Sequence, residues 1–118
     1  ADITQPHTFP HTFRLWHDRA VFHFMTTAEQ RSAYMANLKR ALQPGGFAIV
    51  ATFSETGPEK CSGLPVQRYS AESLSTELGP DFKLLNTQNE SHTTPWGSTQ
   101  DFVYCLFNYC PSPGQTLD

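Results

Sequence analysis

Charge is scarce in this chain of 118 residues, in which charged side chains make up 16% of the sequence. Eight Lys and Arg residues stand against eleven Asp and Glu residues, and the formal net charge is −3. A domain that binds nucleic acid neutralises phosphates with a basic patch or stripe. The sequence contains no such stripe, so nucleic acid is not an expected partner.

Cysteine is also rare, with only Cys61, Cys105 and Cys110 in the chain. Three cysteines do not form the disulfide framework of a small secreted domain. Cys105 and Cys110 are five residues apart on one expected strand, where they face opposite sides and cannot pair within that strand. We therefore expect reduced thiols and a cytoplasmic location.

Long hydrophobic runs are missing as well. A membrane-spanning helix needs roughly 20 apolar residues in a row, and no run in this sequence approaches that length. No signal peptide is visible either, although a chain that starts within a domain would not show one. Neither a membrane nor a secretory pathway is expected.

The residues that are present alternate between strand and helix patterns. Phe13 to Trp16 predicts a short buried strand, which the polar residues His17, Asp18 and Arg19 interrupt. Thr27 and Gln30 have the spacing of a capping box and predict the start of a helix. The apolar stripe of that helix consists of Tyr34, Met35, Leu38, Ala41 and Leu42, and Pro44-Gly45-Gly46 follows as a stop.

The second half of the chain continues this alternation. Phe47 to Phe53 is a continuous apolar run, typical of a strand buried in a parallel sheet. Ser70 and Gly79 frame a second helix that contains Leu74 and Leu78. The remaining predicted elements are a loop over 54–69, a strand over 82–87, a turn over 91–98 and a last strand over 102–109. The order predicts an α/β layer structure whose closing strand pair is antiparallel.

Several segments resemble class I S-adenosylmethionine-dependent methyltransferases. The segment from Leu38 to Val50 is similar to the family's L-x-P-G-G motif before its fifth strand. The segment from Leu15 to Phe24, LWHDRAVFHF, is similar to a subgroup of small bacterial methyltransferases, as are the segments Cys61-Ser-Gly-Leu-Pro-Val, Arg68-Tyr-Ser-Ala-Glu and His92-Thr-Thr-Pro-Trp-Gly. The resemblance implies methyl transfer from S-adenosylmethionine to a small molecule.

The resemblance also implies a fold. The predicted strands look like the fourth to seventh strands of a Rossmann-like methyltransferase sheet, the last of them antiparallel, with two main helices. We expect residues 1–110 to form a truncated methyltransferase-like domain and residues 111–118 to form a flexible tail. Arg14 stands where the family usually has Asp within the fourth strand, which is a local departure from the pattern.

Six residues match positions that hold the cofactor in the family. Asp2 corresponds to the acidic residue that accepts from the adenine amino group, and Ile3 would pack on the ring. His17, Asp18, Arg19 and Phe22 lie at the strand edge beside the methionine part of the cofactor. An alternative for Asp18 and Arg19 is a buried ion pair that only shapes the turn.

The family's glycine-rich turn has no counterpart in this sequence, which has seven glycines and no G-x-G-x-G pattern. Such a turn lets the backbone approach a ligand closely. We therefore expect that this chain alone binds S-adenosylmethionine weakly and is inactive or incomplete.

The substrate-side candidates are His23, Cys61, His92 and Trp96. His23 or His92 could act as a base, and Cys61 could act as a nucleophile or soft ligand. The alternatives are hydrogen-bonded histidines, an inert loop thiol and a structural role for Pro95-Trp96-Gly97. The loose spacing of the His and Cys residues does not predict a metal site.

The expected partners are inferred from an open edge of the predicted sheet. The segment Phe13 to Trp16 would be an open apolar edge, and such edges recruit other strands. We expect a homodimer through this edge, or a complementing N-terminal half that completes the site in trans. The alternative function is therefore a non-enzymatic, dimerising methyltransferase-like interaction protein.

Overall fold

The computed structural model describes residues 12–19, 21–57, 60–61 and 64–111. Strands β1 (Phe13–Arg19), β2 (Leu42–Phe53), β5 (Phe82–Thr93) and β6 (Thr99–Tyr109) form a four-stranded sheet. Helices α1 (Ala28–Ala41) and α2 (Ala71–Leu78) connect its strands, and the 3-10 turn η1 (Phe22–Phe24) follows β1. Strands β3 (Lys60–Cys61) and β4 (Leu64–Pro65) form a separate small hairpin.

The sheet has the strand order β1-β2-β6-β5. Strand β1 pairs parallel with β2, whereas β6 runs antiparallel to both β2 and β5. The helices α1 and α2 make the connections that parallel strands require, and β5 and β6 are joined directly as a hairpin. The expected α/β class and the expected reversed last strand are confirmed.

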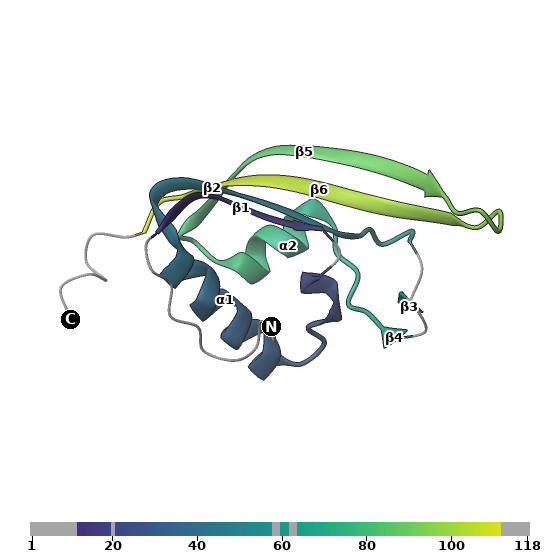
Figure 1. The fold of residues 1–118 in the computed structure, drawn as a ribbon, viewed down its shortest axis with the longest axis horizontal. Helices are drawn as coiled ribbons and strands as arrows, with labels where there is room; N and C mark the ends of the chain where they lie inside the picture. The colour runs from purple at the N-terminus through teal and green to yellow at the C-terminus, as the bar shows by residue number, and fades with distance from the viewer. Residues whose placement is uncertain (1–11, 20, 58–59, 62–63, 112–118) are drawn as a thin grey trace.

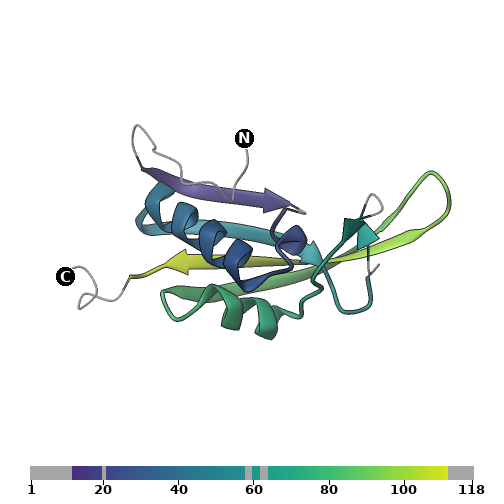
Figure 2. The same cartoon turned by 90° about the horizontal axis from the view of Figure 1, so that it is seen from below.

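Both helices lie on one face of the sheet, below it in Figure 1. Figure 2 shows α1 lying over β1 and β2, and α2 lying over β5 and β6. The covered face carries the core, which includes the fully buried residues Tyr34, Leu38, Val50, Leu74 and Phe107. Tyr34, Leu38 and Ala41 of the apolar stripe predicted for the first helix are buried against the sheet, and Met35 is partly buried. Leu42, which was predicted as part of this stripe, instead belongs to β2.

Local side-chain hydrogen bonds fix the helix starts. The Thr27 hydroxyl accepts from the Gln30 backbone N–H, and the Gln30 side chain accepts from the Thr27 N–H in return. Ser70 and Ser73 make the same reciprocal pair at α2, which ends at Gly79 with a φ of 92°. These bonds satisfy backbone groups that a helix leaves unpaired at its ends.

The Pro44-Gly45-Gly46 segment lies after the end of α1, near the start of β2. Gly45 has a φ of 84°, which favours glycine. A Cβ on Gly46 would lie 2.9 Å from the Arg14 carbonyl oxygen of β1. The two glycines thus allow the irregular register between β1 and the start of β2.

All four strands of the sheet are longer than the sequence pattern predicted. Strand β2 begins at Leu42 rather than at Phe47, and strand β6 begins at Thr99 rather than at Phe102. Strand β1 continues through His17, Asp18 and Arg19, which pair in register with residues 49–51 of β2. Strand β5 continues through the polar residues Gln88 to Thr93, which pair with β6. The β5–β6 hairpin therefore projects beyond the helices (Figure 1), and the turn is confined to residues 94–98.

The second face of the sheet is not covered by any helix of the described residues. Leu15 is 55% exposed on this face and Phe47, its partner in register, is 42% exposed. None of the described helices is long and apolar enough to cross a membrane.

Candidate functional site

The carboxyl ends of β1 and β2 lie side by side, because the two strands are parallel and in register up to Arg19 and Ala51. Open α/β sheets bind ligands at this edge of the strands. The sequence candidates His17, Asp18, Arg19, Phe22 and His23 all lie at this edge or directly after it. We call this region the carboxyl edge.

Asp18 points toward the covered face and is 5% exposed. Its carboxylate accepts from the backbone N–H groups of Val21 (2.9 Å) and Phe22 (3.0 Å). It also accepts a short hydrogen bond from the Tyr34 hydroxyl of α1. Burial raises the pKa of Asp18, against the lowering effect of these hydrogen bonds.

Tyr34 links this carboxylate to the strand. Its hydroxyl accepts from Trp16 Nε1 at 2.9 Å, and its ring packs edge-to-face on Trp16 and Phe22. Burial and the neighbouring Asp18 raise the pKa of Tyr34 well above its usual value. Asp18 and the fully buried Phe22 therefore hold the turn onto α1, and both oxygens of Asp18 are engaged within the protein.

Arg19 points to the uncovered face instead. Its guanidinium carbon lies 5.2 Å from the centre of the Phe102 ring of β6, within the range of a cation–π contact. No ion pair joins Arg19 to Asp18, two residues that the structure describes on opposite faces of β1. The ion-pair alternative for these two residues is therefore wrong.

His23 is fully buried directly beyond the end of β1. Its Nδ1 accepts from the Phe53 backbone N–H at 3.0 Å, whereas its Nε2 has no hydrogen-bond partner among the residues that the structure describes. Burial lowers the pKa of His23 to about 4, so the imidazole is neutral near pH 7. Because Nδ1 accepts, we assign the proton to Nε2, which makes this atom a buried donor with no partner.

A row of rings joins the two histidine candidates across the sheet. The His23 ring lies 4.6 Å from Phe53, Phe53 lies 5.0 Å from Phe102, and Phe102 lies 5.3 Å from His92. His92 Nε2 lies 3.3 Å from Glu90 Oε1. The structure thus brings Arg19, His23 and His92 together around Phe53 and Phe102, two residues that the sequence analysis did not single out.

The other candidates lie elsewhere. Trp96 is 86% exposed at the tip of the β5–β6 hairpin, beyond the end of β2. Cys61 belongs to strand β3, and its side chain is outside the described part. Asp2 and Ile3 also lie outside the described residues. Among the described residues, no group of three His, Cys, Asp or Glu side chains could hold a metal ion.

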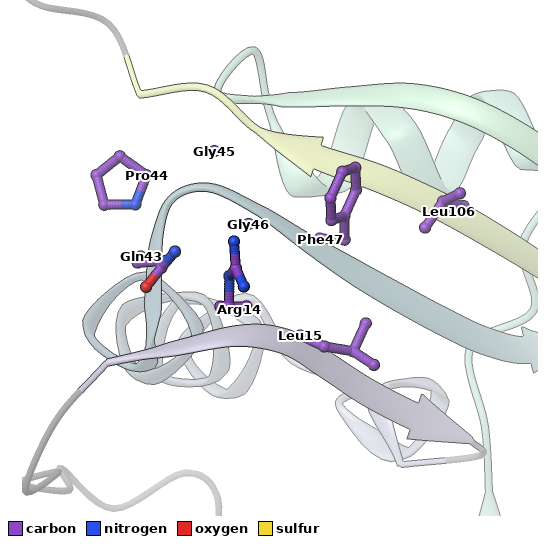
Figure 3. A pocket seen from close by; sticks show the side chains of 8 residues that line it. All are labelled: Arg14, Leu15, Gln43, Pro44, Gly45, Gly46, Phe47 and Leu106. Atoms are coloured by element: carbon purple, nitrogen blue, oxygen red, sulfur yellow. The ribbon is translucent and has the colours of Figure 1, made fainter.

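Side chains of the described residues line hollows on the uncovered face. One, of about 290 Å³, is lined by His17, Ile49, Tyr104 and Leu106 together with polar residues of β5. A larger one, of about 730 Å³, lies at the opposite end, where β2 begins. Figure 3 shows Arg14 and Leu15 of β1, Phe47 of β2 and Leu106 of β6 around the larger hollow. Only the smaller hollow includes a residue of the carboxyl edge, His17.

No known family model and no curated protein matches the sequence. The fold, in contrast, matches solved methyltransferases. A SAM-dependent methyltransferase from Methanosarcina mazei superposes with a TM-score of 0.69 at 10% identity, over 95% of this chain and 66% of its own. The N-methyltransferase NodS from Bradyrhizobium japonicum WM9 gives a TM-score of 0.68 at 17% identity, over 94% and 58%.

A third match is the 1,6-didemethyltoxoflavin-N1-methyltransferase from Burkholderia thailandensis, solved with its namesake compound and S-adenosylhomocysteine bound. Its TM-score is 0.64 at 14% identity, over 92% of this chain and 48% of its own. This chain therefore spans between 48% and 66% of these three solved chains. Together with the strand order and the reversed last strand, these matches show that the chain has the α/β fold of class I S-adenosylmethionine-dependent methyltransferases over part of the domain.

Proposed function

We propose that this chain is part of an enzyme that transfers a methyl group from S-adenosylmethionine to a small molecule. The observation that carries the proposal is the carboxyl edge, at which Arg19, His23 and His92 converge on Phe53 and Phe102. The fold supports it, since two of the solved methyltransferases with this fold hold S-adenosylhomocysteine, and one of them also holds 1,6-didemethyltoxoflavin.

The residues of the edge fit one side of such a site. Arg19 is exposed, and His23 carries a buried Nε2–H group without a partner. A buried polar group normally has a hydrogen-bond partner, so this donor is a candidate contact for a bound ligand. Asp18 and Phe22 do not fit direct contact, because both are turned into the protein and instead hold the turn that presents Arg19 and His23.

S-adenosylmethionine, when bound, supplies an activated methyl group, so the protein must chiefly orient the acceptor in line with it. The neutral His23 has no free lone pair, because Nδ1 accepts from Phe53 and Nε2 holds the proton. It would therefore position a ligand as a hydrogen-bond donor. The role of base, if the acceptor needs one, falls to His92, which lies beside Glu90.

We expect weak but local binding of S-adenosylhomocysteine by the isolated chain. Because the chain provides only one side of the site, we expect a Kd near 1 mM, which corresponds to a binding free energy of about −4 kcal/mol. An NMR titration should shift the amide signals of Arg19, Phe22, His23 and Phe53. The signals of Leu15 and Phe47, at the other end of the sheet, serve as the internal control. Micromolar affinity for S-adenosylhomocysteine would contradict the expectation that the site is incomplete. Unchanged amide signals at the carboxyl edge would contradict the proposed methyl transfer.

The uncovered face supports a second function, a dimerising interaction protein. No described strand pairs with the outer edge of β1, and Phe13, Leu15 and Phe47 next to that edge are between 40% and 55% exposed. A twofold axis along the edge would bring the same apolar patch of two copies together. We therefore propose a second copy of this chain as the occupant of the edge and the hollow in Figure 3.

For this dimer we expect sedimentation to show association at high protein concentration. Leu15→Lys should abolish it, because two charges would meet across the twofold axis without a partner. Leu64→Lys is the matched control, since Leu64 is 58% exposed but lies on β4, outside the sheet. A wild-type chain that stays monomeric, or equal behaviour of the two variants, would rule the dimer out.

A further inference from the structure

The hollow of about 290 Å³ on the uncovered face draws its lining from all four strands of the sheet. His17, Ile49, Leu106 and Asn86 form one row across it, since each is the register partner of the next. Ile49 and Leu106, in the middle of the row, are half-buried and give the hollow an apolar floor. Its volume lies near the lower end of the range for small-ligand sites.

The polar lining of the hollow lies mostly on β5. Asn86, Gln88 and Glu90 are two residues apart, so their side chains stand on the same side of the strand. Tyr104, the register partner of Gln88 on β6, adds a half-buried phenol. Together these residues offer a carboxylate, amide oxygens and a hydroxyl as hydrogen-bond acceptors beside the apolar floor. The lining therefore suits a ligand with an apolar body and N–H donors at one end.

The charge of the lining is negative. Glu90 is the one Asp or Glu residue among the described residues that line the hollow, and no Lys or Arg residue is among them. Arg19 holds its guanidinium over Phe102 and does not line this space. Glu90 Oε1 lies 3.3 Å from His92 Nε2, whereas Oε2 has no hydrogen bond or ion pair with another described residue. Complementary charge in the hollow is therefore that of a cation rather than an anion.

Glu90 also connects the hollow with the carboxyl edge. It is the register partner of Phe102, and its carboxylate contacts His92, whose ring lies 5.3 Å from the Phe102 ring. At the other end of the hollow, His17 is itself a residue of the carboxyl edge. A ligand in the hollow would therefore lie next to the groups on which the proposed methyl transfer depends.

We propose that this hollow binds a small molecule with a flat apolar body and a basic nitrogen group, an amine or amidine, from which Glu90 accepts hydrogen bonds. The proposal rests on the proposed function, because it names the class of methyl acceptor. A cationic nitrogen group fits better than a neutral one, since charge-assisted hydrogen bonds are the stronger ones. The contact with His92 does not block this role, because each carboxylate oxygen has two lone pairs.

The test uses NMR titrations of the 118-residue chain with benzamidine, with its neutral analogue benzamide and with its anionic analogue benzoate. We expect benzamidine to shift the amide signals of Ile49, Glu90 and Leu106, and benzoate to leave them unchanged. Benzamide should bind about fivefold more weakly than benzamidine, because the ion pair with Glu90 is half-exposed.

Glu90→Gln keeps the shape of the side chain and removes its charge, so it should weaken benzamidine binding about fivefold and leave benzamide binding unchanged. Glu72→Gln is the matched control, since it removes the same charge from α2, which lies on the opposite face of the sheet. This control should bind benzamidine as the wild type does.

Benzamidine that fails to shift these signals, or equal affinities of the two Gln variants, would overturn the basic-ligand site. If S-adenosylhomocysteine nevertheless shifts the carboxyl edge in that case, methyl transfer stands and only the acceptor class is wrong. Benzamidine binding that depends on Glu90, with no response of the carboxyl edge to S-adenosylhomocysteine, would instead overturn methyl transfer and support the hollow as a site for basic ligands.

Discussion

Asp18→Ala should destabilise the protein by about 2–3 kcal/mol at pH 7. The substitution leaves three donors without their acceptor, namely the Val21 and Phe22 N–H groups and the Tyr34 hydroxyl. Each buried donor without a partner costs about 1–3 kcal/mol, but water that enters the vacated space reduces the sum. Urea unfolding followed by circular dichroism measures the change.

The pKa of Asp18 sets the pH dependence of this loss. Its pKa is raised in the folded state, mainly by burial, so the folded protein binds a proton that the unfolded chain releases. The stability that Asp18 contributes is therefore complete below its unfolded pKa and declines as the pH rises through its folded pKa. The difference between the wild type and Asp18→Ala should accordingly be larger at pH 4 than at pH 7.

Tyr34→Phe is the matched control, because it keeps the ring contacts with Trp16 and Phe22 and removes only the hydroxyl. We expect a smaller loss of about 1–2 kcal/mol. A loss below about 1 kcal/mol in Asp18→Ala, or a loss equal to that of Tyr34→Phe, would show that the carboxylate does not hold the turn.

The helices could be predicted from the sequence because their boundaries depend on neighbours along the chain. Thr27 with Gln30, Ser70 and Gly79 each act within a few residues, and the structure confirms all of them. Most of the strand lengths could not be predicted in this way. Strand β5 extends over polar residues up to Thr93 because the backbone of β6 pairs with them, and no hydrophobic pattern records that pairing.

The candidate site was predictable only in part for a similar reason. The sequence placed Arg19 at a strand end, since the apolar run before it stops there, and offered His23 only as a possible base. It did not indicate Phe102 as the neighbour of Arg19 or Phe53 as the neighbour of His23, and these two rings meet only through the register between β2 and β6. Nor did it indicate that Tyr34 would bind Asp18, 16 residues away, from a position that the pattern assigns to core packing.

Acid should destabilise this protein through His23. The pKa of His23 is lowered to about 4 in the folded state, from an ordinary value of 6.5, because the imidazole is buried. Between these two values the unfolded chain binds a proton that the folded protein does not. The stability that the neutral His23 contributes is therefore complete above pH 6.5, and it is lost as the pH falls toward 4.

The shift in the pKa of His23 corresponds to at most about 3.5 kcal/mol of folding free energy. We expect a loss of about 2 kcal/mol between pH 8 and pH 4.5 after allowing for relaxation of the site. His23→Asn isolates this contribution, because its side-chain oxygen can accept from the Phe53 N–H in place of Nδ1 but does not titrate. Guanidinium unfolding of both proteins across this range gives the difference.

Asp18 changes stability in the opposite direction over part of the same range, since its raised pKa favours the folded state at low pH. That contribution is common to the wild type and His23→Asn, so it cancels when the two profiles are subtracted. The stability of the wild type should thus fall by about 2 kcal/mol relative to the variant on acidification. Parallel profiles would mean that the folded protein takes up the additional proton at Nδ1 as readily as the unfolded chain, and the neutral imidazole on which the ligand contact of His23 depends would then have to be abandoned.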